Sequence, residues 1–106
     1  MNFADTLRNE IANKNAEIVK TQFEPNKDKA MEILARGIKR IGYVCIDTFN
    51  HTSTAEGGEL SVALGHIKTE HLNALAEWLT KEGFNVTRQW WGYSSDGLPD
   101  MLKIRV

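Results

Sequence analysis

The last third of the chain carries the pattern that most constrains the fold. Apolar residues recur at helical spacing between positions 72 and 79, which predicts a helix with one apolar face. Gly83 follows where a helix-ending residue takes a positive φ without steric cost, and Phe84 is then placed to pack back on Leu79. Two strand-like segments come next, 85–93 and 100–106, joined by the turn residues Asp96, Gly97 and Pro99.

The first 24 residues show a thinner helical pattern. Asn2 is a suitable N-cap, and a narrow apolar stripe follows it, formed by Phe3, Leu7, Ile11 and Ile18. A stripe this narrow cannot support a helix by itself, so the segment must lean on a neighbouring element or on another chain. We therefore expect residues 1–24 to form an N-terminal helix that can detach or exchange.

A second helix is predicted after Pro25. Asn26 can cap its start, Gly42 can end it, and its apolar face consists of Ala30, Ile33, Leu34, Gly37, Ile38 and Ile41. Gly37 lies inside this helix, where a glycine costs roughly 0.5–1 kcal/mol relative to alanine. Its presence predicts that another element approaches the helix closely at this point.

The middle of the chain changes from strand-like to loop-like sequence. Residues 43–49 are predicted to form a central strand, because both of its alternating faces carry apolar side chains. Residues 50–58 are polar and small and are predicted to form a mobile loop. Residues 60–64 indicate a short strand, although a helical turn is an alternative over so few residues. In the last strand, alternate residues are expected to face inward, namely Leu102, Ile104 and Val106.

These elements give the order α-α-β-(β)-α-β-β. The expected fold class is α+β, with two N-terminal helices followed by a three- or four-stranded, mainly antiparallel sheet that includes one crossover helix. At 106 residues the chain is long enough for one hydrophobic core and too short for two. Residues 1–106 are therefore expected to form a single domain.

Charge and cysteine content restrict the function classes. Thirteen basic and fourteen acidic residues give a net charge of −1, which excludes the strong positive field used for non-specific binding to nucleic acid or to anionic membranes. Cys45 is the only cysteine and lies in an apolar run, as expected for a buried hydrophobe in a reducing compartment. The N-terminus lacks a signal-peptide pattern, and no apolar run approaches the roughly 18 residues of a membrane span. A cytoplasmic location without membrane attachment is expected.

Two adjacent tryptophans mark the candidate binding face. Trp90 and Trp91 must point to opposite faces of a strand, and because helices can easily cover only one face, one ring is expected to face outward. Arg88 shares a face with Trp90, and Tyr93 shares one with Trp91. An aromatic ring beside an arginine is typical of a protein-binding hot spot or of a base-stacking platform. The alternative is that both rings pack against the edges of the sheet and helices.

The sequence contains no catalytic or cofactor motif. His51, His66 and His71 do not have the spacing of metal ligands. A thiol at Cys45, inside an apolar strand, is expected to have a raised pKa and to be a poor nucleophile. We therefore expect a protein that is not an enzyme and that holds no metal and no cofactor.

The pattern of residues 27–106 resembles a broad set of small phage-encoded accessory proteins. The similarity lies in the order helix, strand, helix, in the helix ending EGFNV at 82–86, and in an aromatic hairpin that closes on LKIRV at 102–106. The resemblance implies a host-takeover or counter-defence product: a small, non-enzymatic protein that binds host proteins or host signalling molecules and is frequently oligomeric.

Two function classes remain. The first is a module that binds or inhibits a host protein through an exposed aromatic sheet face. The second is a single-stranded nucleic-acid or nucleotide-binding module in which Trp90 or Trp91 stacks on bases while the basic side chains of Arg88, Lys103 and Arg105 contact phosphate. The near-neutral net charge counts against the second class. Because an open apolar sheet face is costly to expose, we also expect a homo-oligomer, most simply a dimer.

Overall fold

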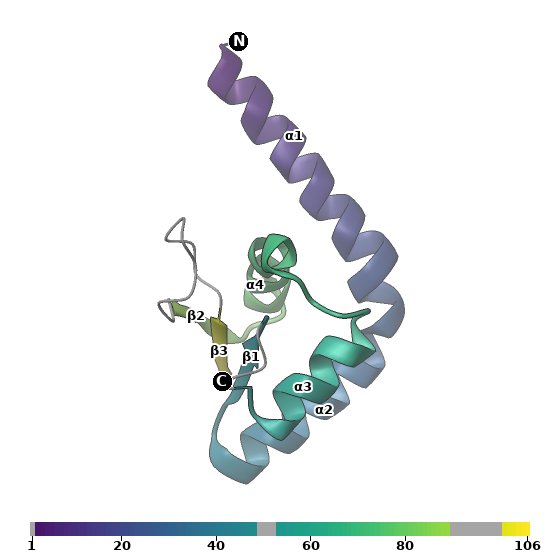
Figure 1. The fold of residues 1–106 in the computed structure, drawn as a ribbon, viewed down its shortest axis with the longest axis vertical. Helices are drawn as coiled ribbons and strands as arrows, with labels where there is room; N and C mark the ends of the chain where they lie inside the picture. Colours follow the sequence, from purple (N-terminus) through teal and green to yellow (C-terminus); the bar gives the residue numbers. More distant parts are fainter. Residues whose placement is uncertain (1, 49–52, 90–100) are drawn as a thin grey trace.

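A computed structural model describes residues 2–48, 53–89 and 101–106 of the chain (Figure 1). The elements in chain order are α1 (Phe3–Ile18), α2 (Lys27–Ile41), β1 (Val44–Asp47), α3 (Ala55–Ala63), α4 (Leu72–Lys81), β2 (Asn85–Gln89) and β3 (Met101–Arg105). Helices pack against one face of a small antiparallel sheet, so the α+β class is confirmed. The number and order of the elements differ from the expected pattern at α3.

α1 and α2 are joined by helical backbone without a break. A π-helical segment, Val19–Phe23, and a 3₁₀ turn, Glu24–Asn26, connect them. Asn26 makes no capping hydrogen bond to α2, and its side-chain amide instead donates to the carbonyl oxygen of Gln22 at 2.9 Å. Asn26 thus stands directly before α2, as predicted, but its side chain does not cap the helix. Pro25 fits without breaking the path, because it lies at the start of a helical turn where its missing N–H has no partner to lose.

α2 ends as the sequence predicts, and its predicted apolar face is buried or half-buried except at Ile41, which is 38% exposed because it is the last residue of the helix. Gly42 has φ +90°, and its N–H donates to the carbonyl of Ile38 at 2.8 Å. Gly37 lies where β1 and α3 come closest to α2: a Cβ built there would stand 2.5 Å from Cγ2 of Val44 and 3.0 Å from Cβ of Glu56. The predicted close approach at Gly37 is confirmed.

Residues 55–63 form helix α3, so the predicted loop is wrong from residue 55 onward and the predicted strand at 60–64 is wrong. The helical alternative holds. Two observations explain it: the Thr54 hydroxyl accepts a hydrogen bond from the N–H of Gly57 at 3.0 Å, and the fully buried Leu60 and Leu64 are one helical turn apart. Apolar residues at alternate positions over only five residues are compatible with a strand or with a helix, and the Thr54 cap favours the helix.

The three described strands have the order β1-β3-β2, with both pairs antiparallel. β3 is therefore central and β1 lies at an edge of this sheet, contrary to the predicted central position of β1. Sequence alternation alone does not distinguish the two positions, because all four residues of β1 are buried. The predicted antiparallel pairing of the last two strands is confirmed, since β2 pairs with β3, while the predicted turn residues Asp96, Gly97 and Pro99 lie outside the described residues.

One face of the sheet supplies the core. Leu102 and Ile104 are fully buried there and pack with apolar residues of α2, α3 and α4 in one cluster. Val106 was expected on the same face, but it is 85% exposed. The register explains this correction: Ile104 pairs with Val44, the first residue of β1, so no β1 residue lies opposite Val106.

α4 follows a 3₁₀ turn, Thr69–His71, and ends as predicted. Gly83 has φ +100°, the N–H of Phe84 donates to Leu79 O at 3.1 Å, and the N–H of Gly83 donates to Thr80 O at 3.0 Å. This is the Schellman arrangement expected from the sequence. The middle of α4 also anchors the chain between α1 and α2, because the Trp78 ring lies 5.3 Å from that of Phe23.

Candidate protein-interaction surface

α1 extends away from the rest of the molecule, with the N-terminus at its far end (Figure 1). None of its sixteen residues is buried. Three large apolar side chains on it are exposed to solvent: Phe3 by 76%, Leu7 by 41% and Ile11 by 57%. They are spaced four residues apart and so lie along one side of the helix. We call these three residues the α1 stripe.

The start of α1 is well specified locally. The side chain of Asn2 accepts a hydrogen bond from the N–H of Asp5 at 2.9 Å, which confirms the predicted N-cap. Arg8 pairs with Asp5 at 2.6 Å, one turn along the same helix. Local hydrogen bonding can therefore hold the helix that presents the α1 stripe, although a helix of this length is marginal by itself in water.

Exposure of the α1 stripe is costly. Burying one such side chain is worth roughly 1.5–3 kcal/mol. Single exposed apolar residues are ordinary on protein surfaces, but a contiguous row is typical of a surface that another molecule covers. The stripe therefore has the character of an interaction surface.

Charged side chains flank the α1 stripe. At 100° per residue, Lys14 falls on the same side of α1 as Leu7 and Ile11, while Glu10 and Glu17 lie along one edge of this side. All three charged side chains are exposed. The surface thus combines an apolar row with an acidic edge and one central cation.

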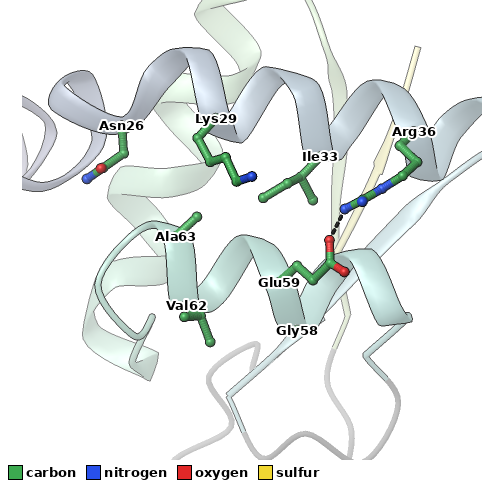
Figure 2. Close-up of a pocket in the computed structure, with 8 residues that line it drawn as sticks. All are labelled: Asn26, Lys29, Ile33, Arg36, Gly58, Glu59, Val62 and Ala63. Atoms are coloured by element: carbon green, nitrogen blue, oxygen red, sulfur yellow. Dashed lines mark ion pairs between the residues drawn. The ribbon is translucent and has the colours of Figure 1, made fainter.

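A groove of about 680 Å³ lies between α2 and α3 (Figure 2). Asn26, Lys29, Ile33 and Arg36 line it from the α2 side, and Gly58, Glu59, Val62 and Ala63 line it from α3. Val62 is 63% exposed. Lys29 has no ion-pair partner among the residues that the structure describes. The groove could accept an apolar side chain together with a neighbouring carboxylate or carbonyl oxygen.

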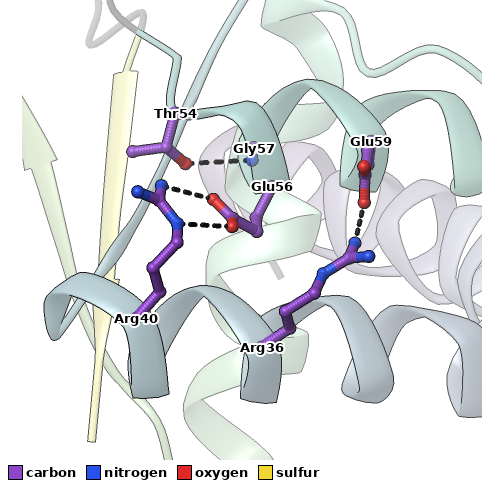
Figure 3. Close-up of polar contacts among 6 residues, drawn as sticks. All are labelled: Arg36, Arg40, Thr54, Glu56, Gly57 and Glu59. Atoms are coloured by element: carbon purple, nitrogen blue, oxygen red, sulfur yellow. Dashed lines mark hydrogen bonds and ion pairs between the residues drawn. The ribbon is translucent and has the colours of Figure 1, made fainter.

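Two ion pairs hold α3 against α2 at this groove (Figure 3). Arg36 pairs with Glu59 at its rim. Arg40 binds Glu56 through two hydrogen bonds, Nε to Oε1 and NH2 to Oε2, each 2.8 Å long. Hydrogen bonding from Arg40 lowers the pKa of Glu56 from 4.5 to about 2. Glu56 is therefore a structural anion at neutral pH and not a candidate proton donor.

The basic residues predicted for binding do not share one face. Arg88 pairs with Leu102 in the register, so it lies on the helix-covered face, where its guanidinium donates to the side-chain oxygen of Asn73 in α4. Lys103 and Arg105 lie on the other face, and Nζ of Lys103 is 4.5 Å from the centroid of the Tyr43 ring. The sheet thus separates Arg88 from the other two. Trp90, Trp91 and Tyr93 lie outside the described residues.

The predicted buried position of Cys45 is confirmed. Its side chain is 7% exposed, and burial raises the pKa of its thiol. The ring of His71 accepts a hydrogen bond from the N–H of Lys68 at 3.2 Å, and burial lowers its pKa. Across residues 2–48, 53–89 and 101–106, no three His, Cys, Asp or Glu side chains come together as metal ligands would.

Sequence reasoning found the apolar row of α1 but missed the groove. The groove needs Gly58 and Val62 on a helix beside α2, whereas the sequence pattern favoured a loop and a strand there. The signal that could have found it is the capping position of Thr54, three residues before Gly57.

None of the described helices is both long and apolar enough to span a bilayer. Comparison with protein-family models, with curated proteins and with solved structures gives no match for this chain.

Proposed function

We propose that the protein is a small, non-enzymatic binding protein that attaches to another polypeptide through the α1 stripe. The observation that carries the proposal is the exposure of Phe3, Leu7 and Ile11 on a helix with no buried residue. Helices that dock into apolar grooves or onto other helices use anchors at this spacing. The α2–α3 groove and the outward ring of Trp90 or Trp91 would add contact area.

Charge favours a polypeptide over a membrane as the partner of α1. The helix carries three acidic residues, Asp5, Glu10 and Glu17, against the two basic residues Arg8 and Lys14. Helices that lie on anionic bilayers are rich in lysine and arginine on their polar face. An acidic helix edge is better matched by a protein surface with complementary charge.

Nucleic-acid binding remains the alternative, and it now depends on Trp90 and Trp91 alone. A phosphate track needs cations along one face, and Arg88 lies on the face opposite Lys103 and Arg105.

Within the phage class that the sequence resembles, the partner would be a host protein in the host cytoplasm. Occupation of its surface would inhibit it without any chemical step.

A matched pair of variants tests the proposal. Ile11→Glu places a charge in the α1 stripe, and Val106→Glu makes the same kind of change at an exposed valine outside both the stripe and the α2–α3 groove. Tagged wild type and both variants are used to capture polypeptides, including untagged copies of the chain, from a cell lysate, and mass spectrometry quantifies them. If Ile11 is a hot spot, its replacement should weaken capture by about 30-fold, equivalent to about 2 kcal/mol.

Val106→Glu should capture polypeptides at the wild-type level, because its side chain lies outside the α1 stripe and the α2–α3 groove. Circular dichroism of both variants should match wild type, because both side chains point to solvent. Undiminished capture of every polypeptide by Ile11→Glu would exclude the α1 stripe as the binding surface.

A further inference from the structure

We propose that the outer edge of β2 binds an extended, acidic segment of a partner polypeptide, which joins the sheet as an added strand. This site is separate from the α1 stripe, which lies on the projecting helix (Figure 1). Three features of the molecule support the added strand: an open strand edge, a groove between that edge and α4, and the positive charge of β2 and β3.

The two edges of the described sheet differ. The strand order β1-β3-β2 places β1 at one edge and β2 at the other. The start of α3 covers the edge at β1, where the carbonyl oxygen of Cys45 accepts a hydrogen bond from the N–H of Thr54 at 3.2 Å. Within residues 2–48, 53–89 and 101–106, β3 is the only element whose main chain pairs with β2. The other edge of β2 is therefore open in this part of the chain.

The open edge has the regular geometry that a strand can join. Alternate residues of an edge strand direct their N–H and C=O groups away from the sheet. β2 pairs with β3 at five consecutive positions, Asn85–Gln89, without a bulge to twist the edge away, and its sequence contains no proline. An extended polypeptide satisfies such main-chain groups with a single ladder of hydrogen bonds, which is the source of affinity in strand addition.

A groove of about 290 Å³ lies between β2 and α4. Its described lining residues include none from β1 or β3, so the groove is on the outer side of β2. They are Ala76, Glu77, Thr80 and Lys81 of α4, with Val86 and Arg88 of β2. In a strand added to β2, every second side chain would face the helices and enter this groove. The volume corresponds to roughly ten water molecules, which is room for the side chains of one strand.

Charge favours an acidic segment. The described strands β2 and β3 carry three cations and no acidic residue. Arg88 lies on the helix-covered face, and Arg105, which pairs with Asn85, lies on the other face, so an added strand would meet a cation on each of its faces. In the groove, Lys81 offsets the single acidic residue, Glu77. Carboxylates in the added strand would complement this arrangement.

The same charge disfavours a second copy of this chain as the added strand. Two β2 edges paired with each other would bring the cations of both copies together, with no acidic side chain in β2 or β3 to compensate them. Like charges across a strand pair are destabilising. A charged side chain on an edge strand, here Arg88, is a common device against pairing between identical edges.

Nuclear magnetic resonance with a synthetic probe tests the site. The probe is a peptide of about eight residues in which valine alternates with glutamate, so that one face is apolar and the other acidic. A control peptide of the same sequence has alternate amides N-methylated, which removes donors needed for the ladder. In isotope-labelled protein, the probe should shift the amide signals of β2 and of α4 residues 76–81. At saturation it should slow hydrogen exchange at alternate β2 amides by at least about 10-fold.

The N-methylated control should produce neither change. Equal effects of the two peptides would overturn the proposal, because the contact would then not be a strand ladder. Signal shifts confined to residues outside β2 and α4 would overturn it as well, as would no shift with the probe at about 1 mM.

Charge reversal tests the preference for an acidic segment. Arg88→Glu should weaken binding of the glutamate probe by at least about 5-fold and strengthen binding of a probe with lysine in place of glutamate. Lys39→Glu makes the same kind of reversal at an exposed cation of α2, outside the β2–α4 groove, and should bind the glutamate probe like wild type. Because Arg88 also donates to Asn73, the two probes are compared on wild type too. Equal affinity of wild type for both would refute the acidic preference.

A second copy is distinguished without any probe. Protection of alternate β2 amides that appears as the protein concentration rises would assign the edge to another copy of this chain and overturn the proposal. Exchange at these amides should instead be independent of protein concentration. None of these measurements involves the α1 stripe, so their outcome is separate from the capture experiment with Ile11→Glu.

Discussion

Two adjacent glycines in α3 give a sharp test of how this helix packs on β1. A Cβ built on Gly57 would stand 1.7 Å from the carbonyl oxygen of Cys45, whereas one built on Gly58 meets nothing within 4 Å. The Cys45 carbonyl cannot turn away freely, because it accepts a hydrogen bond from the N–H of Thr54 at 3.2 Å. The same added methyl group is therefore expected to change the free energy of unfolding in opposite directions at Gly57 and Gly58.

The magnitudes follow from the geometry. Alanine in place of glycine inside a helix gains roughly 0.5–1 kcal/mol, which is the whole effect expected for Gly58→Ala. In Gly57→Ala, contact with the Cys45 oxygen must open from 1.7 Å to at least 3.4 Å. A shift of that size moves α3 away from β1 and loosens the fully buried Leu60. Overpacking of this kind costs about 1–3 kcal/mol or more, so we expect a net loss of about 2–3 kcal/mol.

Urea denaturation of the two variants measures the difference. For a domain of this size a gap of about 3 kcal/mol between them corresponds to midpoints about 2 M apart. Gly58→Ala should unfold at higher urea than wild type, and Gly57→Ala at lower. If both variants shift the midpoint in the same direction, the packing of α3 on β1 through Gly57 is refuted.

Other contacts provide shorter tests. Glu56→Gln should lower the urea unfolding midpoint at neutral pH, and equal midpoints at pH 7 would contradict this. Because the pKa of Glu56 is lowered from 4.5 to about 2, the difference in midpoint between this variant and wild type should shrink as the pH falls from 4.5 to 2. Gly83→Val should lower the free energy of unfolding by at least about 1–2 kcal/mol, since φ is +100°; an unchanged midpoint would mean that the helix ends differently. Deletion of residues 1–11 should leave the thermal midpoint of the monomer within a few degrees, because none of residues 2–11 is buried, and loss of cooperative melting would contradict this.

Local signals in the sequence predicted what local interactions determine. The end of α4 depends on Gly83, Phe84 and Leu79, which are within five residues of one another, and the predicted ending is present. The N-cap at Asn2 and the end of α2 at Gly42 are correct for the same reason. In each case the hydrogen bonds that decide the conformation join residues no more than five positions apart.

Features that depend on distant residues were not predictable in this way. α3 is a partial exception, because its N-cap at Thr54 is a local signal that the predicted loop and strand overlooked, whereas its packing through Gly57 against Cys45 joins positions twelve residues apart. The place of β1 at an edge depends on which strand pairs with β3. The α2–α3 groove could not be predicted either, because it forms only when residues 55–63 are helical. The apolar row of α1 was visible in the sequence, but only the structure shows that the molecule leaves Phe3, Leu7 and Ile11 uncovered.

The continuous helical backbone from α1 into α2 means that a change in direction at the base of α1 is amplified at its N-terminal end. α1 rises about 24 Å over its sixteen residues, so a change of about 10° in its direction moves its far end by about 4 Å. The base of α1 is the π-helical segment Val19–Phe23, where Phe23 is fully buried beside Trp78. A small change in the packing of these two rings would therefore displace the N-terminal end of α1, and any molecule bound at Phe3, by several times as much. Conversely, a force applied at Phe3 would be transmitted to Phe23 and Trp78 in the core.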